Sequence, residues 1–157
     1  MQYIIFGILG IIAVLLGIAV IRTLMIKAPA IGECKTEISE EEIETAAKKL
    51  GDMVRVPTVS KNEDEDLSEF YKYHEVLEEL FPNVHKTFEK TVLNGTLLFK
   101  WQGKGNSKPV LFMSHHDVVE ATGEWEHGAF SGDIDENGRI WGRGTVDTKA
   151  SLFCMLQ

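Results

Sequence analysis

A histidine and an aspartate stand two residues apart in the segment Ser114-His115-His116-Asp117. The segment follows the apolar run 109–113, which is typical of a short strand buried on both faces of a sheet. Residues i and i+2 of an extended chain point to the same side, so His115 and Asp117 share a face and His116 points away. A carboxylate beside a histidine can orient its ring for metal binding. On spacing alone, a capped strand end with an ordinary turn aspartate explains the pattern better.

A second segment with chemical potential is Gly-Arg-Gly-Thr-Val-Asp-Thr-Lys, residues 142–149. Two glycines bracket Arg143, and Asp147 stands where a helix is expected to begin. A carboxylate has two oxygens with about four lone-pair sites, so Asp147 is able to bridge two divalent cations. A tight turn followed by an N-cap aspartate is the simpler interpretation. The segment lacks the glycine spacing of a phosphate-binding loop.

The elements that must support these segments begin with a capped helix. Ser39 and Glu42 have the spacing of a capping box, and apolar residues recur on one face after them, which predicts a helix over 40–52. Pro57 ends any helix by the preceding residue. The polar, acidic run 61–66 is typical of a solvated loop.

A second apolar stripe at helical spacing predicts a helix over 66–80, closed by Pro82. His74 lies on the apolar face of that helix. A histidine in such a place is more often a satisfied core or boundary residue than a metal ligand, and we interpret His74 in that way.

Strands are expected next. Two β-like runs, 84–93 and 96–101, are joined by Asn94-Gly95, the strongest short signal for a hairpin turn. A further short strand is expected at Ile140 and Trp141, and residues 149–157 are compatible with a helix. Helices, then strands, then a strand–loop–helix unit together predict an α/β fold with a parallel or mixed sheet.

Composition limits the classes of function. A chain of 157 residues leaves room for about one domain. Its net charge of −8 argues against nucleic-acid binding, which needs a basic face to neutralise phosphates. Cys34 and Cys154 lack the spacing of a zinc or redox pair, so two free thiols are the expected state.

The first 22 residues predict a membrane anchor. From Tyr3 to Ile21 the chain runs nineteen residues without a charge, and about 20 apolar helical residues span a bilayer core. The run is apolar all round, longer than the apolar core of a signal peptide and not preceded by a basic residue, which favours an anchor over the alternative, a cleaved signal peptide. We therefore expect an anchor over 1–22, a juxtamembrane linker over 23–38 and a soluble domain over 39–157.

Taken together, the two polar segments resemble the N-terminal signature of the co-catalytic zinc metallopeptidases and amidohydrolases. That family includes Gly-Xaa carboxypeptidase, aminoacylase, acetylornithine deacetylase and succinyl-diaminopimelate desuccinylase. The residues that carry the resemblance are His115-x-Asp117-Val-Val, Trp125, Phe130-Ser-Gly, Trp141-Gly-Arg-Gly-Thr-Val-Asp147-x-Lys149 and, upstream, Arg55-Val-Pro-Thr-Val-Ser60. The resemblance covers about residues 38–157, and it implies that 39–157 is the N-terminal part of a zinc-exopeptidase-like α/β catalytic domain, in which helices flank a mixed sheet.

The resemblance also implies roles for single residues. His115 would ligate one zinc ion, Asp117 would orient that histidine, and Asp147 would bridge two zinc ions. The substrate would be a dipeptide or an N-acyl amino acid. The family's catalytic glutamate and remaining ligands lie further along, so we expect this chain alone to be inactive and to bind zinc poorly. His85 and His127 fall outside the ligand positions and are expected at the surface or in loops.

Two other hypotheses stay open. The chain is either a fragment of such an enzyme, a non-catalytic membrane-anchored module that keeps part of the fold for binding, or an unrelated domain whose motifs match by chance. The side of the membrane is equally open, since Arg22, Lys27 and Lys35 favour a cytoplasmic domain whereas the related carboxypeptidases are vacuolar or secreted. The sequence gives no indication of the oligomeric state.

Overall fold

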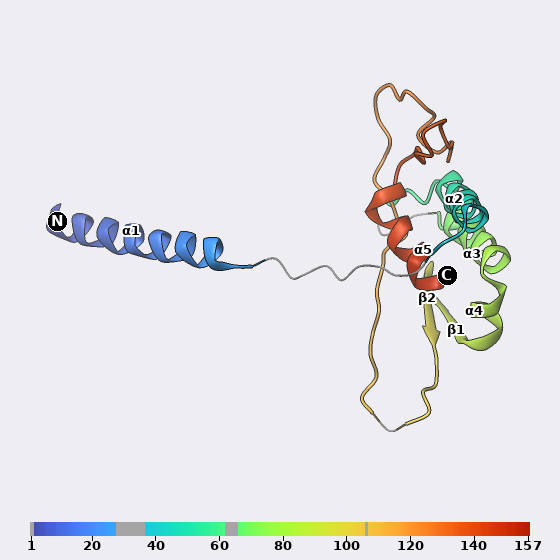
Figure 1. Ribbon diagram of the computed structural model, residues 1–157, viewed down its shortest axis with the longest axis horizontal. Coiled ribbons are helices and arrows are strands. Elements are labelled where there is room, and N and C mark those ends of the chain that lie inside the picture. Colours follow the sequence, from blue (N-terminus) through green and yellow to red (C-terminus); the bar gives the residue numbers. More distant parts are fainter. Residues whose placement is uncertain (1, 28–36, 62–65, 106) are drawn as a thin grey trace. The chain divides into compact units, whose positions relative to one another are not determined.

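The computed structural model describes residues 2–27, 37–61, 66–105 and 107–157. The chain divides into two compact units, Met1–Glu37 and Ile38–Gln157 (Figure 1). Most of the expected linker, including Cys34, and most of the acidic loop 61–66 lie outside the described residues. Cys154 is a free and exposed thiol.

The first unit consists of the long helix α1, Gln2–Met25. None of its residues is buried, and it has no polar face. By length and composition alone it is able to cross a membrane, although a signal sequence near the N-terminus would pass the same test. The helix is therefore consistent with the expected anchor without distinguishing the anchor from a signal sequence.

The second unit opens with α2, Glu40–Arg55, and its predicted capping box is confirmed. The hydroxyl of Ser39 accepts from the backbone N–H of Glu42 at 3.2 Å, and the Glu42 carboxylate accepts from the backbone N–H of Ser39 at 2.9 Å. Glutamates at the first three helical positions also suit the positive end of the helix dipole. The helix ends one turn later than predicted, at the last residues that Pro57 permits.

The predicted second helix is α3, Ser68–Leu80, and His74 is buried on it as expected. Pro82 does not simply close this helix, because it begins a further short helix, α4, Pro82–Thr87. Proline suits a first helical position, where no N–H is needed. The β prediction for residues 84–87 is therefore wrong. His85 is also not a surface residue: its side chain is 5% exposed and packs edge-on against Phe99, with ring centroids 5.0 Å apart.

The predicted hairpin is confirmed over β1, Glu89–Leu93, and β2, Thr96–Lys100, which pair antiparallel with Leu93 opposite Thr96. The two turn residues have positive φ angles, 46° at Asn94 and 81° at Gly95. Positive φ at both central positions defines the tight turn that matches strand twist, and Asn-Gly is its favoured sequence.

The run 109–113 does not form the predicted buried strand. Val110, Leu111, Phe112 and Met113 are 70–77% exposed, and β1 and β2 form the one sheet among the described residues. A strand that is apolar on both faces is stable only beside other strands, and no described segment pairs with this run. The described part of the second unit, Ile38–Gln157, is accordingly a mixture of helices with a small antiparallel sheet, rather than helices around a mixed sheet. The strand expected at residues 140–141 is reduced to a single bridge between Ile134 and Ile140.

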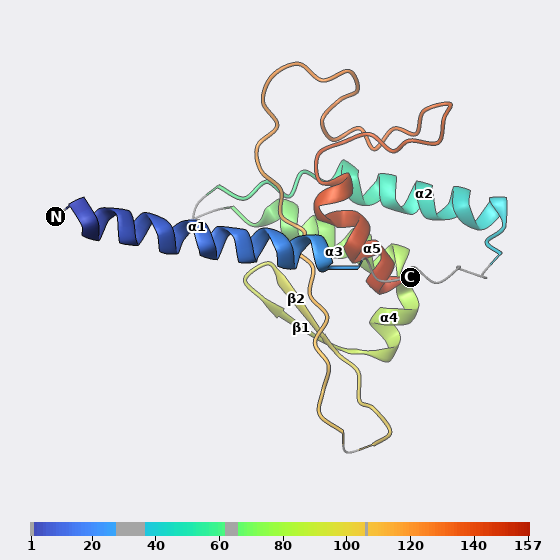
Figure 2. The same ribbon diagram turned by 60° about the vertical axis from the view of Figure 1, so that its left-hand side comes forward.

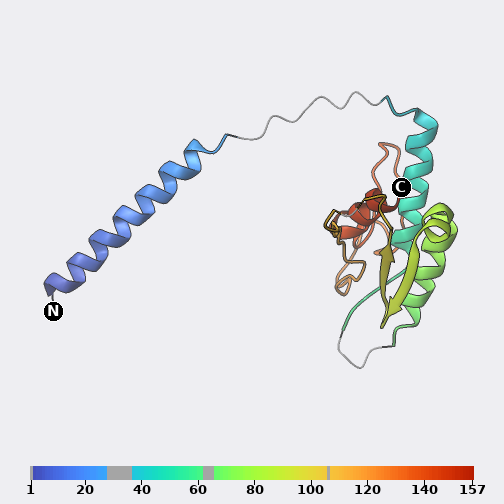
Figure 3. The ribbon, with the colours of Figure 1, turned by 90° about the horizontal axis from the view of Figure 1, so that it is seen from below.

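The core lies between α2, α3 and the last helix, α5, Ala150–Leu156, which confirms the predicted C-terminal helix (Figure 2). Its buried apolar residues are Leu50, Met53, Val54, Val56, Tyr73, Leu77 and Phe81. The π-helical turn η1, Thr145–Lys149, leads into α5 and packs on α2. The hairpin lies along α3 (Figure 3), where the Gly95 turn contacts Leu67 and Phe70.

Candidate metal centre

The segment that carries His115 is held in an extended form by residues just after α2. The backbone N–H of Val118 donates to the Thr58 carbonyl at 2.8 Å, and the N–H of Ser60 donates to the Val118 carbonyl at 3.1 Å. The fully buried Thr58 hydroxyl donates to the His116 carbonyl. These bonds make a parallel bridge between Val59 and Val118, so the segment 114–117 next to it is extended like a strand without belonging to a longer strand.

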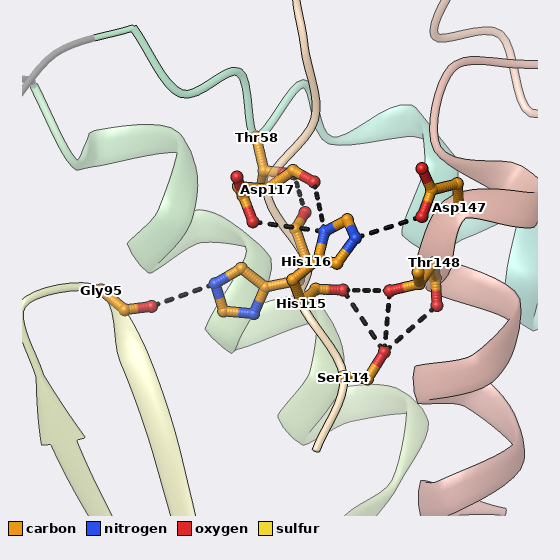
Figure 4. A network of polar contacts seen from close by, with 8 residues as sticks. All are labelled: Thr58, Gly95, Ser114, His115, His116, Asp117, Asp147 and Thr148. Carbon is orange, nitrogen blue, oxygen red and sulfur yellow. Dashed lines mark hydrogen bonds and ion pairs between the residues drawn. The ribbon is translucent and has the colours of Figure 1, made fainter. Parts of the chain in front are cut away.

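The extended geometry sends the two neighbouring histidines to opposite sides, as the alternation predicts (Figure 4). Nε2 of His116 and Nε2 of His74 both donate to the Gly95 carbonyl, at 3.1 and 2.9 Å. Burial first, and the nearby His74 second, lower the pKa of His116 to about 4. His116 therefore serves as a neutral donor that fixes the hairpin turn, and His115 is left on the other side.

Asp147 approaches the His115 ring from η1. The turn begins after Gly144, whose φ of 83° and close contact with Val118 suit glycine alone. The next residue after Asp147, across a cis peptide bond, is Thr148, whose hydroxyl donates to the His115 carbonyl at 2.7 Å. The Ser114 hydroxyl lies 2.8 Å from that of Thr148. The two polar segments are thus joined directly, although 32 residues separate His115 from Asp147.

His115 lies between the two aspartates (Figure 4). Its Nδ1 is 3.1 Å from the backbone carbonyl of Asp117 and 3.3 Å from that residue's Oδ1, and its Nε2 is 3.1 Å from Oδ1 of Asp147. The hydrogen bond to the Asp117 carbonyl, more than the one to Asp147, raises the pKa of His115. When a neutral His115 donates from Nδ1, its Nε2 turns a lone pair toward the Asp147 carboxylate. Two acceptors are then face to face, and this arrangement is stable only with a proton or a cation between them.

These donors fit a zinc ion chemically. Two ligands of one tetrahedral zinc, each about 2.1 Å from the metal, lie about 3.4 Å apart, close to the separation of Nε2 and Oδ1 here. The side chains of His115 and Asp147 are 50% and 84% exposed, so both are accessible. They form only part of a ligand set, since the described residues contain no group of three or more histidine, cysteine, aspartate or glutamate side chains placed to hold a metal. A zinc site normally takes at least three protein ligands.

Three residues that position this pair were not singled out from the sequence: Thr58, Ser114 and Thr148. Each uses a hydroxyl to hold the backbone of the 114–117 segment or its partner. Ser114 and Thr148 stand directly beside His115 and Asp147 in the chain, and a small hydroxyl residue adjoining each candidate ligand was an available signal. Thr58 gives no such signal, because its partner lies 58 residues away.

A cavity of about 430 Å³ opens beside the pair. Its polar wall contains His115 and Asp117, and most of its remaining lining is apolar. The apolar residues come from α3, the hairpin and α5: Phe70, Leu77, Leu97, Phe99, Leu152 and Leu156. Of the two candidate metal ligands, His115 thus adjoins a space suited to an apolar group.

Comparison with known proteins confirms the resemblance to a family of peptidases. Residues 111–157, which contain the candidate ligands, match Peptidase family M20/M25/M40. The chain is similar to members of this M20 peptidase family.

Three relatives show the same similarity over a larger part of the chain. Probable carboxypeptidase S-like 2 of Dictyostelium discoideum is 37% identical over 130 residues, which cover 78% of this chain and 24% of the relative. Carboxypeptidase S of Saccharomyces cerevisiae is 35% identical over 69% of this chain and 21% of its own length. The N-fatty-acyl-amino acid synthase/hydrolase PM20D1 of Xenopus tropicalis is 37% identical over 78% of this chain and 25% of its own length. The chain therefore spans about a quarter of the relatives it matches, and no solved structure matches it.

Proposed function

We propose that this chain contributes the first two ligands of a two-zinc centre that hydrolyses an amide bond next to a free carboxylate. His115 would bind one zinc through Nε2, and Asp147 would use its two carboxylate oxygens to bridge two zinc ions. The observation that carries the proposal is the 3.1 Å approach of Nε2 to Oδ1, with Nδ1 of the same ring held by Asp117. Such an approach between an imidazole lone pair and a carboxylate calls for a proton or a cation between them, and we propose that zinc takes this place.

The residues around the pair would keep it in the form that binds metal. The Asp117 carbonyl accepts from Nδ1, which keeps the Nε2 lone pair of a neutral His115 available. The Asp117 carboxylate at 3.3 Å adds negative charge on the same side of the ring, which strengthens the imidazole as a ligand. When bound, zinc supplies the polarisation of the substrate carbonyl and a water of lowered pKa. A general base and the further ligands would come from residues other than those described here.

The substrate would be a dipeptide or an N-acyl amino acid. Relatives with similar sequences are named as carboxypeptidases and as N-fatty-acyl-amino acid synthase/hydrolases. The apolar lining of the adjoining cavity is suited to an acyl group or an apolar side chain. We further propose that α1 is an uncleaved membrane anchor for this domain, because it is exposed along its whole length and carries no charge from Tyr3 to Ile21.

Zinc titration of the whole chain in detergent micelles tests the ligand assignment. With imidazole carbons labelled, zinc should shift the NMR signals of the His115 ring first and those of His127 least. His115→Ala and Asp147→Ala should each abolish the effect, whereas His127→Ala, a change at a half-buried residue that stacks on Trp141, should leave it unchanged. Zinc that perturbs other histidines first, or binds equally well to both ligand variants, would refute the assignment.

A chimaera tests the reaction. Residues 38–157 would replace the matching segment of the yeast carboxypeptidase S, which supplies the rest of its own chain. Hydrolysis of a dipeptide by the chimaera, lost with His115→Ala or Asp147→Ala, is the expected result. A folded, zinc-loaded chimaera whose hydrolysis survives both substitutions would instead favour a binding module that does not take part in catalysis.

A further inference from the structure

Lys149 is a buried lysine that the proposed chemistry does not use. Its side chain is completely buried, and its Nζ donates to the backbone carbonyls of Met53, at 2.9 Å, and Val56, at 2.7 Å. The ammonium group also lies 4.7 Å from the centre of the Tyr73 ring. No carboxylate in the described residues forms an ion pair with it. Burying a lysine without a carboxylate partner costs free energy. The two hydrogen bonds to backbone carbonyls are what offset this cost.

The carbonyls that Lys149 binds lie at the C-terminal end of α2, where helical carbonyls lose their normal donors. The normal donor to the Met53 carbonyl would be the backbone N–H four residues later. That residue is Pro57, which has no N–H. Lys149 therefore replaces, from 96 residues away in sequence, a hydrogen bond that the helix is unable to make for itself.

The residues directly after these carbonyls also hold the other candidate ligand. The backbone of Thr58 and Ser60 binds Val118 on both sides, and the Thr58 hydroxyl binds the His116 carbonyl. The segment 53–60 is thus attached at one end to Lys149, two residues after Asp147, and at the other to the strand-like segment that begins at His115. One short piece of chain fixes both sides of the metal pair.

We propose that Lys149 is a positioning residue for the metal centre: by clamping η1 to the end of α2, it sets the separation of Asp147 from His115. The inference rests on the proposed function, because it gives this spacing a purpose. A simpler role is also conceivable, in which Lys149 only caps α2. The two roles differ in what a new donor at position 57 would restore.

Pro57→Ala provides that donor. An alanine at position 57 has a backbone N–H that is able to bond the Met53 carbonyl once Val56, which is extended in the structure (φ −88°, ψ 116°), turns helical, and Pro57→Ala alone controls for that change. Lys149→Met keeps an unbranched, apolar side chain of similar length but removes both hydrogen bonds. The double variant K149M/P57A therefore restores the helix end without restoring the link between α2 and η1. If Lys149 is only a cap, the double variant recovers everything; if it positions Asp147, it recovers stability alone.

The experiment uses the whole chain in detergent micelles with two measurements beyond urea unfolding. The first, without metal, is the set of NMR nuclear Overhauser contacts between the His115 ring and the Asp147 side chain. The second is the zinc affinity read from the His115 ring signals. We expect Lys149→Met to lose the contacts and to weaken zinc binding on the order of tenfold, as loss of a residue that orients a ligand does. K149M/P57A should regain resistance to urea but neither the contacts nor the affinity.

The remaining outcomes also decide the matter. Recovery of the contacts and the zinc affinity in K149M/P57A would overturn the positioning role and leave a cap. Unchanged contacts in Lys149→Met would overturn it as well. If zinc does not bind at His115 even in the unmodified chain, the proposed function fails, and the metal-free contacts still show whether Lys149 sets the spacing.

Discussion

Lowering the pH should destabilise the second unit, Ile38–Gln157, because unfolding allows His116 to bind a proton. In the folded chain the pKa of this residue is about 4, because its ring is buried and lies beside His74. In the unfolded chain a histidine has a pKa near 6.5. Between these values the unfolded state binds the proton and the folded state does not, so stability is full above about pH 6.5 and is lost as the pH falls toward 4.

The size of the effect follows from the same two values. A difference of about 2.5 pKa units corresponds to about 3.4 kcal/mol when the transition is complete. Over the narrower interval from pH 7 to pH 5, the loss from His116 alone is about 2 kcal/mol. Burial also lowers the pKa of His74, which adds to the loss in the same direction.

Urea unfolding of the detergent-solubilised chain at several pH values, followed by tryptophan fluorescence, measures this loss. His116→Gln is the matched variant, because its Nε2 amide can still donate toward the Gly95 carbonyl but does not titrate. The unmodified chain should lose about 2 kcal/mol more than the variant between pH 7 and pH 5. Equal losses in both chains, or an NMR titration of the His116 ring near its ordinary pKa, would show that the ring is not held as a buried neutral donor.

Three substitutions test the local structure by the same unfolding measurement. Ser39→Ala removes the capping box and should cost about 1 kcal/mol, whereas an unchanged midpoint would mean that the cap is not formed. Gly144→Ala places a Cβ 2.5 Å from Val118 at a positive φ and should cost more than 1 kcal/mol, against almost nothing for Gly105→Ala, whose Cβ meets open space; similar costs would contradict the close contact. Leu111→Ser, at a residue 70% exposed, should change stability by less than about 0.5 kcal/mol, and a loss of 2 kcal/mol or more would instead place this run in a buried strand.

The elements predicted correctly from the sequence are those specified by neighbouring residues. The capping box of α2 needs only Ser39 and Glu42, and the hairpin turn needs only Asn94 and Gly95, because a positive φ at both positions is a local property. The errors at Pro82 and at the run 109–113 have different causes. Proline both ends a helix and suits the start of the next, and hydropathy reports that a strand would be buried without reporting whether neighbours are present to bury it.

Some features of the candidate site are specified by neighbouring residues, and others depend on residues far away in the sequence. The identities of His115, Asp117 and Asp147 were available from the two motifs, and whether they bind metal stays a prediction. What joins the motifs was not available, because it consists of single hydrogen bonds that cross long stretches of chain: Thr58 to His116 and Lys149 to Met53. A motif indicates which side chains are the candidate ligands. The residues that set the spacing of those side chains become known only with the backbone geometry. For that reason Pro57, which has no functional group to offer, is as informative about the site as the ligands are: the missing N–H explains why a lysine is buried two residues after Asp147.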